Sequence, residues 1–308
     1  MRKQTATSGS YAAYLAMVRS LARWYGGFLL VCALLLLLAV LGMWVFTAQS
    51  LASSVAAVGQ VLDFQLLLYM VVGFVAQLID GSLGMAYGIS STSFLMSTGV
   101  PPAIASANVH LAEVFTTAVS GLSHWRMGNV DRKLFFKLAM PGALGAGLGA
   151  FVLSNFDGAV IKPFVAIYLL VMGLIVICKA YKKNIQFKEY KRPRLLALIG
   201  GFVDASGGGG WGPIVTTTLI GSGNNPKLTI GTVNAVEFLV ALTASGIFTL
   251  SIGIGSWQII VGLIVGGALA APVGALVCHY IRVRPAMILV GTLIIFLSLR
   301  TLLLMWWG

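Results

Sequence analysis

Four acidic residues lie inside long apolar stretches of the chain, where a charge is costly: Asp80, Glu113, Asp204 and Glu237. An unpaired carboxylate at the centre of a bilayer costs about 2.5–3.5 kcal/mol on insertion scales, so such groups usually bind substrate or carry protons. His110 stands three residues before Glu113, which places both on one helix face as a candidate proton relay. We therefore expect this histidine together with Glu113, Asp204 and Glu237 to serve coupling or proton transfer. A helix-capping role stays open, most of all for Asp204.

Each of the two aspartates begins a glycine-rich break in an apolar run. The first break reads DGSLGMAYG from Asp80, and the second reads DASGGGGWG from Asp204. Consecutive glycines end a helix, and the N–H groups that open the next helix then lack partners and suit an anion. Broken backbone at membrane depth is tolerated only inside protein or beside a watery cavity. The predicted substrate-binding residues are Asp80, Gly81, Ser82, Thr92, Asn108, Gly207, Gly208, Gly209, Gly210, Trp211 and Asn234.

Polar residues near the breaks supply further hydrogen-bonding groups. Asn108 and Asn234 each stand near the start of the apolar helix that follows a break, and hydroxyl clusters at 90–93 and 216–218 add donors. Trp211 could close the site as a gate or anchor the segment, and the sequence leaves both readings open. The glycine ladder at 142–149 is instead typical of close helix packing.

Composition places the chain in a membrane. Of its 308 residues, 58% are hydrophobic and 9% charged, whereas soluble domains carry about 25% charged residues. The formal net charge of +12 does not indicate nucleic-acid binding, because the basic residues form short clusters between apolar runs, as cytoplasmic loops do. Its three cysteines stand singly, and no Cys/His cluster exists, so we expect no disulfide, metal or cofactor.

The two halves of the chain repeat one pattern, which is a signature of secondary transporters. The matched segments follow the same order in both halves: Gly73-Phe74-Val75 with Gly201-Phe202-Val203, Ser120-Gly121 with Ser245-Gly246, and Lys162-Pro163 with Arg284-Pro285. The predicted organisation is an N-terminal cytoplasmic segment and anchor helix at 1–63, transport repeat 1 at 64–180, a basic cytoplasmic linker at 181–194, and transport repeat 2 at 195–308.

Loop charge indicates how the broken segments cross the membrane. If each is a hairpin and the N-terminus is cytoplasmic, every Lys and Arg except Lys162 and Arg300 falls on the cytoplasmic side. Continuous spans with the N-terminus outside separate the 20 basic residues much less clearly, with 12 on one side and 8 on the other. We therefore predict an all-α, multi-pass fold of two inverted repeats with glycine-broken hairpins, and an outside C-terminus.

The segments GFVAQLIDGSLGMAYG and GVPPAIASANVHLAEVFTTAVSGLSHWRMGNVD, with GGFVDASGGGGWGPIVTTTLI in the second half, resemble the sulfite exporter (TauE/SafE) family. The similarity covers about residues 64–306. It implies a carrier in the cytoplasmic membrane that moves sulfite or small organosulfonates outward. The first break has fewer glycines than this family usually carries, so whether both breaks contact substrate equally is left open.

The predicted function is export of sulfite or a small organosulfonate through a central site between the two broken hairpins, without enzymatic activity. An anion channel is an alternative that the sequence does not separate from a carrier. An intramembrane aspartyl protease using Asp80 and Asp204 is another, although the GxGD setting is absent. The expected partners are the lipid bilayer and the small sulfur oxyanion. Proton or sodium coupling and a homodimer are left open.

Overall fold

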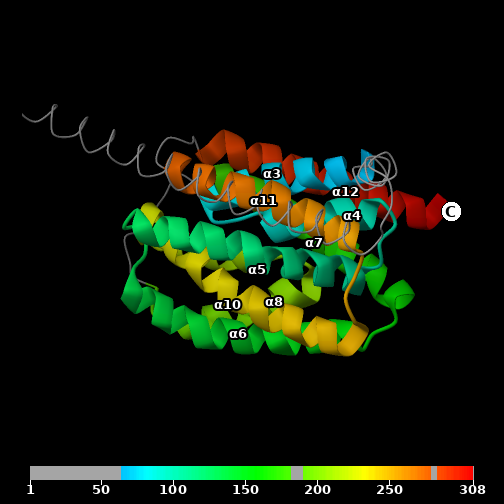
Figure 1. The fold of residues 1–308 in the computed structure, drawn as a ribbon, viewed down its shortest axis with the longest axis horizontal. Coiled ribbons are helices and arrows are strands. Elements are labelled where there is room, and N and C mark those ends of the chain that lie inside the picture. Colours follow the sequence, from blue (N-terminus) through cyan, green and yellow to red (C-terminus); the bar gives the residue numbers. More distant parts are fainter. Residues whose placement is uncertain (1–63, 182–189, 279–282, 308) are drawn as a thin grey trace, which may run out of the picture. The chain divides into compact units, whose positions relative to one another are not determined.

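The computed structural model describes residues 64–181, 190–278 and 283–307, and this part of the chain is helical throughout. The predicted N-terminal anchor and most of the predicted linker lie outside the described residues. Figure 1 shows the arrangement of the helices. Their bounds are α3 Phe64–Leu83, α4 Tyr87–Ser97, α5 Pro102–Arg126, α6 Arg132–Ser154, α7 Gly158–Tyr181, α8 Pro193–Gly207, the π-helix η1 Gly212–Thr216, α9 Thr217–Gly221, α10 Pro226–Ile252, α11 Trp257–Val277 and α12 Val283–Trp307.

Among the described residues, six helices are long and apolar enough to cross a membrane: α3, α6, α7, α10, α11 and α12. Large apolar side chains such as Phe136, Leu148 and Leu293 lie exposed on their outer surfaces. Lipid is the solvent that such surfaces require. The all-helical, multi-pass fold predicted from the sequence is confirmed.

Both predicted breaks interrupt the helices. The first lies between α3 and α4, where Gly84 and Ala86 adopt positive φ angles of 67° and 100°. The second follows α8, where Gly208 and Gly209 have φ angles of 73° and 137°. Glycine adopts this left-handed region without the steric cost that other residues meet. Each long helix is therefore followed, after a few irregular residues, by a short second helix.

The first broken segment is a hairpin. Gly262, near the start of α11, packs against Tyr69, near the start of α3. Gly255, just before α11, lies against the side chain of Asn108 in the first turns of α5. The start of α3 and the end of α4 thus lie at the same end of the bundle.

The second broken segment turns back in the same way, but from the opposite end. Lys137, in the first turns of α6, and Arg192, just before α8, line one pocket. Gly231, at the start of α10, packs against Asn129, which precedes α6. The start of α8 and the end of α9 therefore lie where α6 begins, at the end opposite to the opening of the first hairpin.

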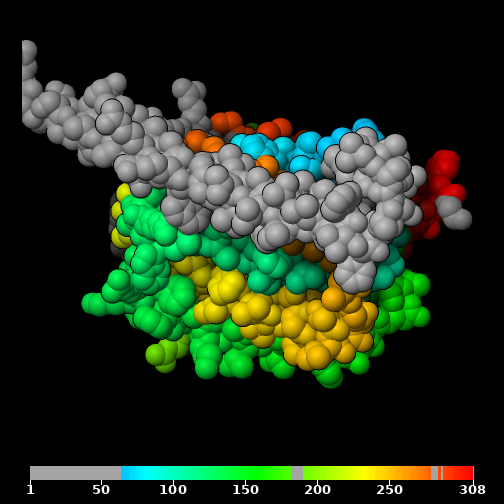
Figure 2. Space-filling model, in the orientation of Figure 1, coloured from blue at the N-terminus to red at the C-terminus, as the bar shows by residue number. Residues whose placement is uncertain are grey.

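Helix packing exchanges partners between the two halves. α3 packs on α11 and α8 on α6, while α5 packs on α11 and α10 on α6. The pairs α5–α10 and α7–α12 join equivalent helices of the two halves. In Figure 2, α10 (yellow to orange) lies between α5 (teal) and α6 (green). This exchange is what an internal pseudo-two-fold axis produces, and it accords with the predicted repeat, whose boundaries stay a prediction.

The glycine ladder of α6 has the packing role that its spacing favours. Gly145 and Gly149 lie directly against backbone atoms of Leu198 and Phe202 in α8. A side chain at either position would hold α6 and α8 apart. The ladder therefore brings α8, and with it the second break, against the first half of the chain.

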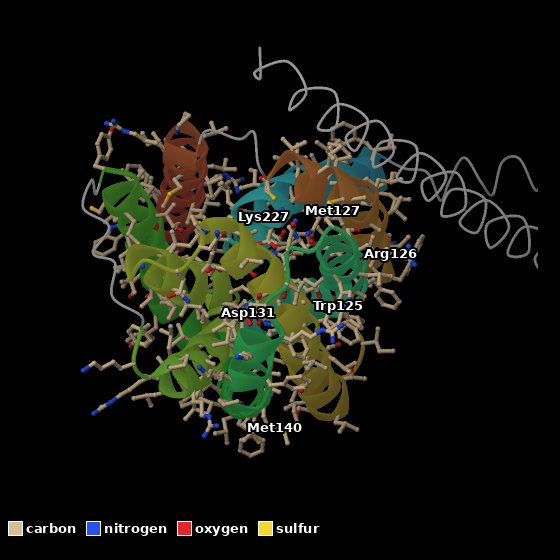
Figure 3. The ribbon with its side chains drawn as sticks, turned by 90° about the vertical axis from the view of Figure 1, so that its left-hand side faces the viewer. Trp125, Arg126, Met127, Asp131, Met140 and Lys227 are labelled. Atoms are coloured by element: carbon tan, nitrogen blue, oxygen red, sulfur yellow. The ribbon has the colours of Figure 1, made fainter. Side chains whose placement is uncertain are left out.

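Charged residues gather at one end of the bundle. In Figure 3, Arg126, Asp131 and Lys227 lie at the end that faces the viewer. The C-terminus lies at the opposite end in Figure 1. At that opposite end, Arg300 donates to the carbonyl oxygen of Ser97.

Candidate functional site

The two breaks lie directly against each other. A Cβ atom added to Gly88, in the first turn of α4, would lie only 2.9 Å from the Cα atom of Gly209. In the mirrored position, Gly212 of η1 packs against the backbone of Met85. The same contact thus occurs twice, with the two halves exchanged, and a Cβ atom at Gly88, Gly209 or Gly212 would overlap the backbone of the other half.

Threonines from each short helix complete the contact. Thr216 of η1 donates from its Oγ1 to the carbonyl oxygen of Gly84, at 2.6 Å. Thr92 of α4 lies against Gly208 in the equivalent place, but its hydroxyl has no hydrogen-bond partner among the described residues. The two halves are therefore similar in backbone and different in hydrogen bonding.

The N-terminus of α4 presents unpaired donors. Ala86 precedes the helix and provides no side-chain cap, and the first cap bond runs from the Ser90 N–H to the Ala86 carbonyl. Within the described part of the chain, no hydrogen bond is formed by the N–H groups of Gly88 or Ile89, while the Tyr87 N–H faces the carboxyl group of Asp80. These groups carry the positive end of the helix dipole, which suits an anion.

The donors of the second break already have an acceptor. Asp204 Oδ1 accepts from the N–H of Gly210 at 2.8 Å and from the N–H of Trp211 at 2.9 Å. The Asp204 carbonyl also accepts from the Gly209 N–H at 2.8 Å. Asp204 therefore caps the helix that follows it, which is the role that the sequence left open. An anion at this break would have to compete with its carboxylate.

Asp80 holds the equivalent position in the first break without the same bonds. It stands seven residues before Tyr87, as Asp204 stands seven residues before Trp211. Its carboxyl faces the Tyr87 N–H, yet neither oxygen reaches hydrogen-bonding geometry. Only 1% of Asp80 is exposed to solvent.

His110, Asp204 and Glu113 form a buried cluster beside the breaks. His110 Nε2 lies 3.2 Å from Asp204 Oδ2 and 4.0 Å from Glu113 Oε2. Both Glu113 oxygens lack hydrogen-bond partners among the described residues, and Gly88 lies next to Oε1 of Glu113. The cluster joins α5 of the first half to α8 of the second half at the crossing point.

The same three side chains are close enough to hold a metal ion, since one ligand atom of each lies within 4.8 Å of the others. However, the Nε2–Oδ2 distance of 3.2 Å is that of a hydrogen bond. Asp204 Oδ1, which caps the second break, is also already occupied.

Unpartnered polar groups concentrate around the crossing point. Burying a hydroxyl, amide or carboxyl group without a hydrogen bond is costly, and native proteins contain few of these groups. The described residues whose buried side-chain atoms lack partners include Gln77, Asp80, Ser90, Ser91, Thr92, Ser93, Asn108, Glu113, Thr116 and Glu237. Such a concentration indicates a place that binds polar molecules or ions.

The two asparagines differ in their surroundings. Asn234 accepts at Oδ1 from the Ser120 hydroxyl at 2.8 Å, and its Nδ2 donates to the carbonyls of Ile230 at 3.1 Å and Asp80 at 3.5 Å. Asn234 thus holds the end of α3 in place. Asn108 is equally buried, but its amide has no hydrogen-bond partner in the part of the chain that the structure describes, and Gly255 covers it.

The remaining predicted residues pack between helices. Gly81 lies against Gly274 of α11, and the Ser82 hydroxyl donates to the Ile79 carbonyl at 2.9 Å. Trp211 is fully buried, with its ring against Gly142 and Gly200. Its indole N–H donates to the Val233 carbonyl at 3.3 Å. These contacts are those of an anchor, one of the two readings that the sequence left open for Trp211.

Two residues that hold the second break, Tyr168 and Lys179, were not predicted from the sequence. The Tyr168 hydroxyl donates to the Gly209 carbonyl at 2.6 Å, and its ring covers Gly207. Lys179 Nζ donates to the Pro213 carbonyl at 2.9 Å, within the π-helical turn. Tyr168 has no counterpart in the repeat, because Val290 stands five residues after Pro285 as Tyr168 stands five after Pro163. Comparison of the halves therefore gave no signal.

Apolar helices that carry two oppositely directed broken hairpins, with a buried polar centre where the breaks meet, define the architecture of a secondary transporter. Sequence comparison identifies the family. The model of the sulfite exporter TauE/SafE family matches residues 69–301. The chain belongs to this family, as the resemblance of its broken segments indicated.

Curated proteins similar to this chain are named as probable membrane transporters. The probable membrane transporter protein YtnM of Bacillus subtilis (strain 168) is 42% identical over 252 residues, which cover 79% of this chain and 84% of YtnM. A probable membrane transporter protein of Haemophilus influenzae is 27% identical over 214 residues, covering 66% of this chain and 81% of the relative. No solved structure matches the chain significantly. The protein is a multi-pass membrane protein of a transporter family.

Proposed function

We propose that this protein is a carrier that exports sulfite or a small organosulfonate across the cell membrane. The substrate binds where the two breaks meet. The observation that carries the proposal is the pair of N–H groups of Gly88 and Ile89 without acceptors among the described residues, buried beside hydroxyl and amide groups that also lack partners there. A sulfur oxyanion presents several acceptor oxygens, and donors of this kind are what it requires.

The first break is the main binding element in this proposal. Its donors are unpaired, whereas Asp204 occupies those of the second break. Thr92 and Ser91, on α4, and Asn108, on α5, add polar groups without partners. From the other half, Gly208 covers Thr92, and Gly209 covers the backbone of Gly88 and Ile89. The substrate enters and leaves when the two breaks move apart on one side or the other.

Charge distribution supports an orientation. The end of the bundle with Lys137, Arg192 and Lys227 is basic, and basic ends face the cytoplasm. The opposite end, with Arg300, then faces outward. Outward movement of an anion is favoured by the membrane potential, by about 2.3 kcal/mol per charge at 100 mV.

Two alternatives make different predictions. An anion channel would need a continuous path, whereas the breaks close on each other at Gly88 and Gly209; this contact favours a carrier. An aspartyl protease needs two carboxyl groups that share a water molecule. The bonds of Asp204 to the Gly210 N–H and to His110 favour a structural and proton-binding role instead.

Counterflow tests the proposal. Proteoliposomes loaded with unlabelled substrate are diluted into a trace of labelled sulfite or labelled 2-hydroxyethanesulfonate. A carrier produces a transient accumulation of label, which a channel does not. The variant Thr92→Val should raise the KM several-fold. Thr243→Val is the matched control, because the Thr243 hydroxyl only bonds back to Leu239 within α10. Absence of counterflow for both anions in folded protein would overturn the proposal.

A further inference from the structure

The protonation of His110 follows from its hydrogen bonds. The Ser106 hydroxyl donates its one proton to the Ala205 carbonyl at 2.9 Å. His110 Nδ1 lies 2.8 Å from the Ser106 carbonyl oxygen, which can only accept. Nδ1 must therefore carry a proton. If the imidazole is neutral, the lone pair of Nε2 then points at the carboxyl group of Asp204.

A neutral imidazole does not suit these surroundings. Nε2 lies 3.2 Å from Asp204 Oδ2 and 4.0 Å from Glu113 Oε2, so its lone pair would face carboxylate oxygens. One proton between Nε2 and Oδ2 converts this repulsion into a charge-assisted hydrogen bond. His110 and Glu113 are at most 1% exposed and Asp204 is 2% exposed, so solvent does not weaken the interaction.

The surroundings of the cluster are acidic. The titratable groups within electrostatic reach of the cluster are Asp80 on α3, Tyr87 on α4, Tyr168 on α7 and Glu237 on α10. The Phe248 ring lies beside His110, with ring centroids 5.8 Å apart. The helices that supply these groups place their Lys and Arg residues near their ends, namely Arg126, Lys162, Lys179, Arg194 and Lys227.

An anion cannot bind beside several ionised carboxylates without compensation. Like charges at short distance in a buried site repel strongly. We propose that His110, held by Asp204 and Glu113, binds a proton that crosses the membrane together with the anion in the same direction. This inference rests on the proposed function, because it names the ion that moves with the substrate.

The position of the cluster explains how the two events are coupled. Gly88, whose N–H is one of the donors at the start of α4, lies next to Oε1 of Glu113. Protonation of Nε2 supplies a positive charge to the site, and it also ties α5 to α8 across the two halves. The anion favours the protonated state, and the proton leaves to the side on which the anion is released. An acidic exterior should therefore oppose export. For a singly charged sulfonate the anion gradient must drive export, because the proton cancels the charge that the membrane potential would act on; doubly charged sulfite keeps one net negative charge.

The second half has no equivalent cluster. Val236 stands two residues after Asn234, as His110 stands two residues after Asn108. Glu237 also follows Asn234 at a shorter spacing than that of Glu113 from Asn108. One proton site per transport unit is therefore expected, in spite of the repeated architecture.

The test measures accumulation driven by a pH gradient. Proteoliposomes are clamped at zero membrane potential with valinomycin and equal potassium, and one pH unit is imposed across them. Labelled 2-hydroxyethanesulfonate and labelled sulfite are the probes, and the sulfonate stays ionised at every pH used. Cotransport with one proton should accumulate the sulfonate about tenfold on the alkaline side, since one pH unit equals a tenfold ratio.

Substitutions distinguish a loss of proton coupling from a loss of folded protein. His110→Gln removes the positive charge from the site, so it should raise the KM for counterflow and lower the accumulation ratio of the remaining transport to about one. Glu113→Gln removes a negative charge beside the imidazolium, so half-maximal exchange should move to more acidic pH. His124→Gln is the control on the same helix, because His124 is buried and bonds to the Gly81 carbonyl. This control should keep the tenfold ratio.

Each outcome decides one claim. Wild-type protein that shows counterflow but does not respond to the pH gradient would refute proton cotransport and leave the carrier intact. A response to a sodium gradient instead would also refute it. If only sulfite is carried, the wild type and His110→Gln are compared at one gradient, because sulfite protonation in solution is identical for both; equal ratios would refute the inference. Loss of counterflow itself in the wild type would refute the proposed function.

Discussion

Gly209 crosses Gly88 at backbone contact, and this crossing joins the second break of the chain to the first. Its Cα atom lies where a Cβ on Gly88 would be 2.9 Å away. Oε1 of Glu113 would lie 3.2 Å from that Cβ atom. The proposed substrate donors, the His110 cluster and the contact between the two halves therefore lie next to one another.

Gly209→Ala should disrupt this crossing. Residue 209 has a φ of 137°, and a Cβ there would overlap the backbone of Gly88 and Ile89. We expect a loss of at least about 2 kcal/mol in the free energy of unfolding, from backbone strain and overlap together. Thermal unfolding in detergent measures it. Gly221→Ala is the control, because a Cβ there meets nothing within 4 Å; equal melting temperatures for the two variants would contradict the packing described.

Substitution of Asp204 should separate its capping role from its charge. Asp204→Ala removes the acceptor of the Gly210 and Trp211 N–H groups, and each buried unpaired donor costs about 1–3 kcal/mol. Asp204→Asn keeps an acceptor oxygen for these groups but removes the negative charge that faces His110. We expect a large fall in melting temperature for Asp204→Ala and a small one for Asp204→Asn, with pH-driven accumulation lost in the latter. A stable Asp204→Ala protein would disprove the cap.

The equivalent threonines should respond differently. Thr216→Val removes the hydrogen bond to the Gly84 carbonyl, so unfolding should become easier by about 1 kcal/mol. Thr92→Val removes a hydroxyl that has no protein partner. It should leave the melting temperature unchanged and raise the KM for the anion. Melting temperature and transport are measured for both variants. A lower melting temperature for Thr92→Val together with a raised KM for Thr216→Val would contradict the roles assigned to the two threonines.

The asparagines allow a parallel comparison. Asn234→Ala breaks bonds to Ser120, Ile230 and Asp80, and we expect a loss of stability with little change in KM for the folded fraction. Asn108→Ala removes an amide without partners, so stability should hold while substrate affinity falls several-fold. Binding affinity and melting temperature are measured on the same preparations. An unchanged affinity in Asn108→Ala would remove this residue from the binding site.

The fold was largely predictable because its signals are local or repeated. Glycine runs end helices wherever they occur, and the matched segments of the halves predict that the breaks are related. Loop charge then favours hairpins over continuous spans, since it places nearly all basic residues on one side. None of these signals depends on contacts between distant residues.

The division of labour at the site depends on such contacts and could not be predicted. Asp80 and Asp204 precede their second helices by the same spacing, yet only Asp204 reaches the N–H groups. Asn108 and Asn234 occupy matching positions, but Ser120 lies beside one of them alone. The role of Trp211 as a gate or an anchor was also undecided, because Gly142, against which its ring packs, lies far away in sequence.

The central claim is that a sulfonate binds where the two breaks meet. Crystals of the protein with 2-bromoethanesulfonate, measured at the bromine absorption edge, would locate the anion through the anomalous scattering of bromine. We expect a peak between the first turn of α4, at Tyr87–Ile89, and the Gly208–Gly209 backbone, and no such peak in the Thr92→Val, Asn108→Ala double variant. A peak found only elsewhere, such as at the basic pocket of Lys191 and Arg194, would contradict the account.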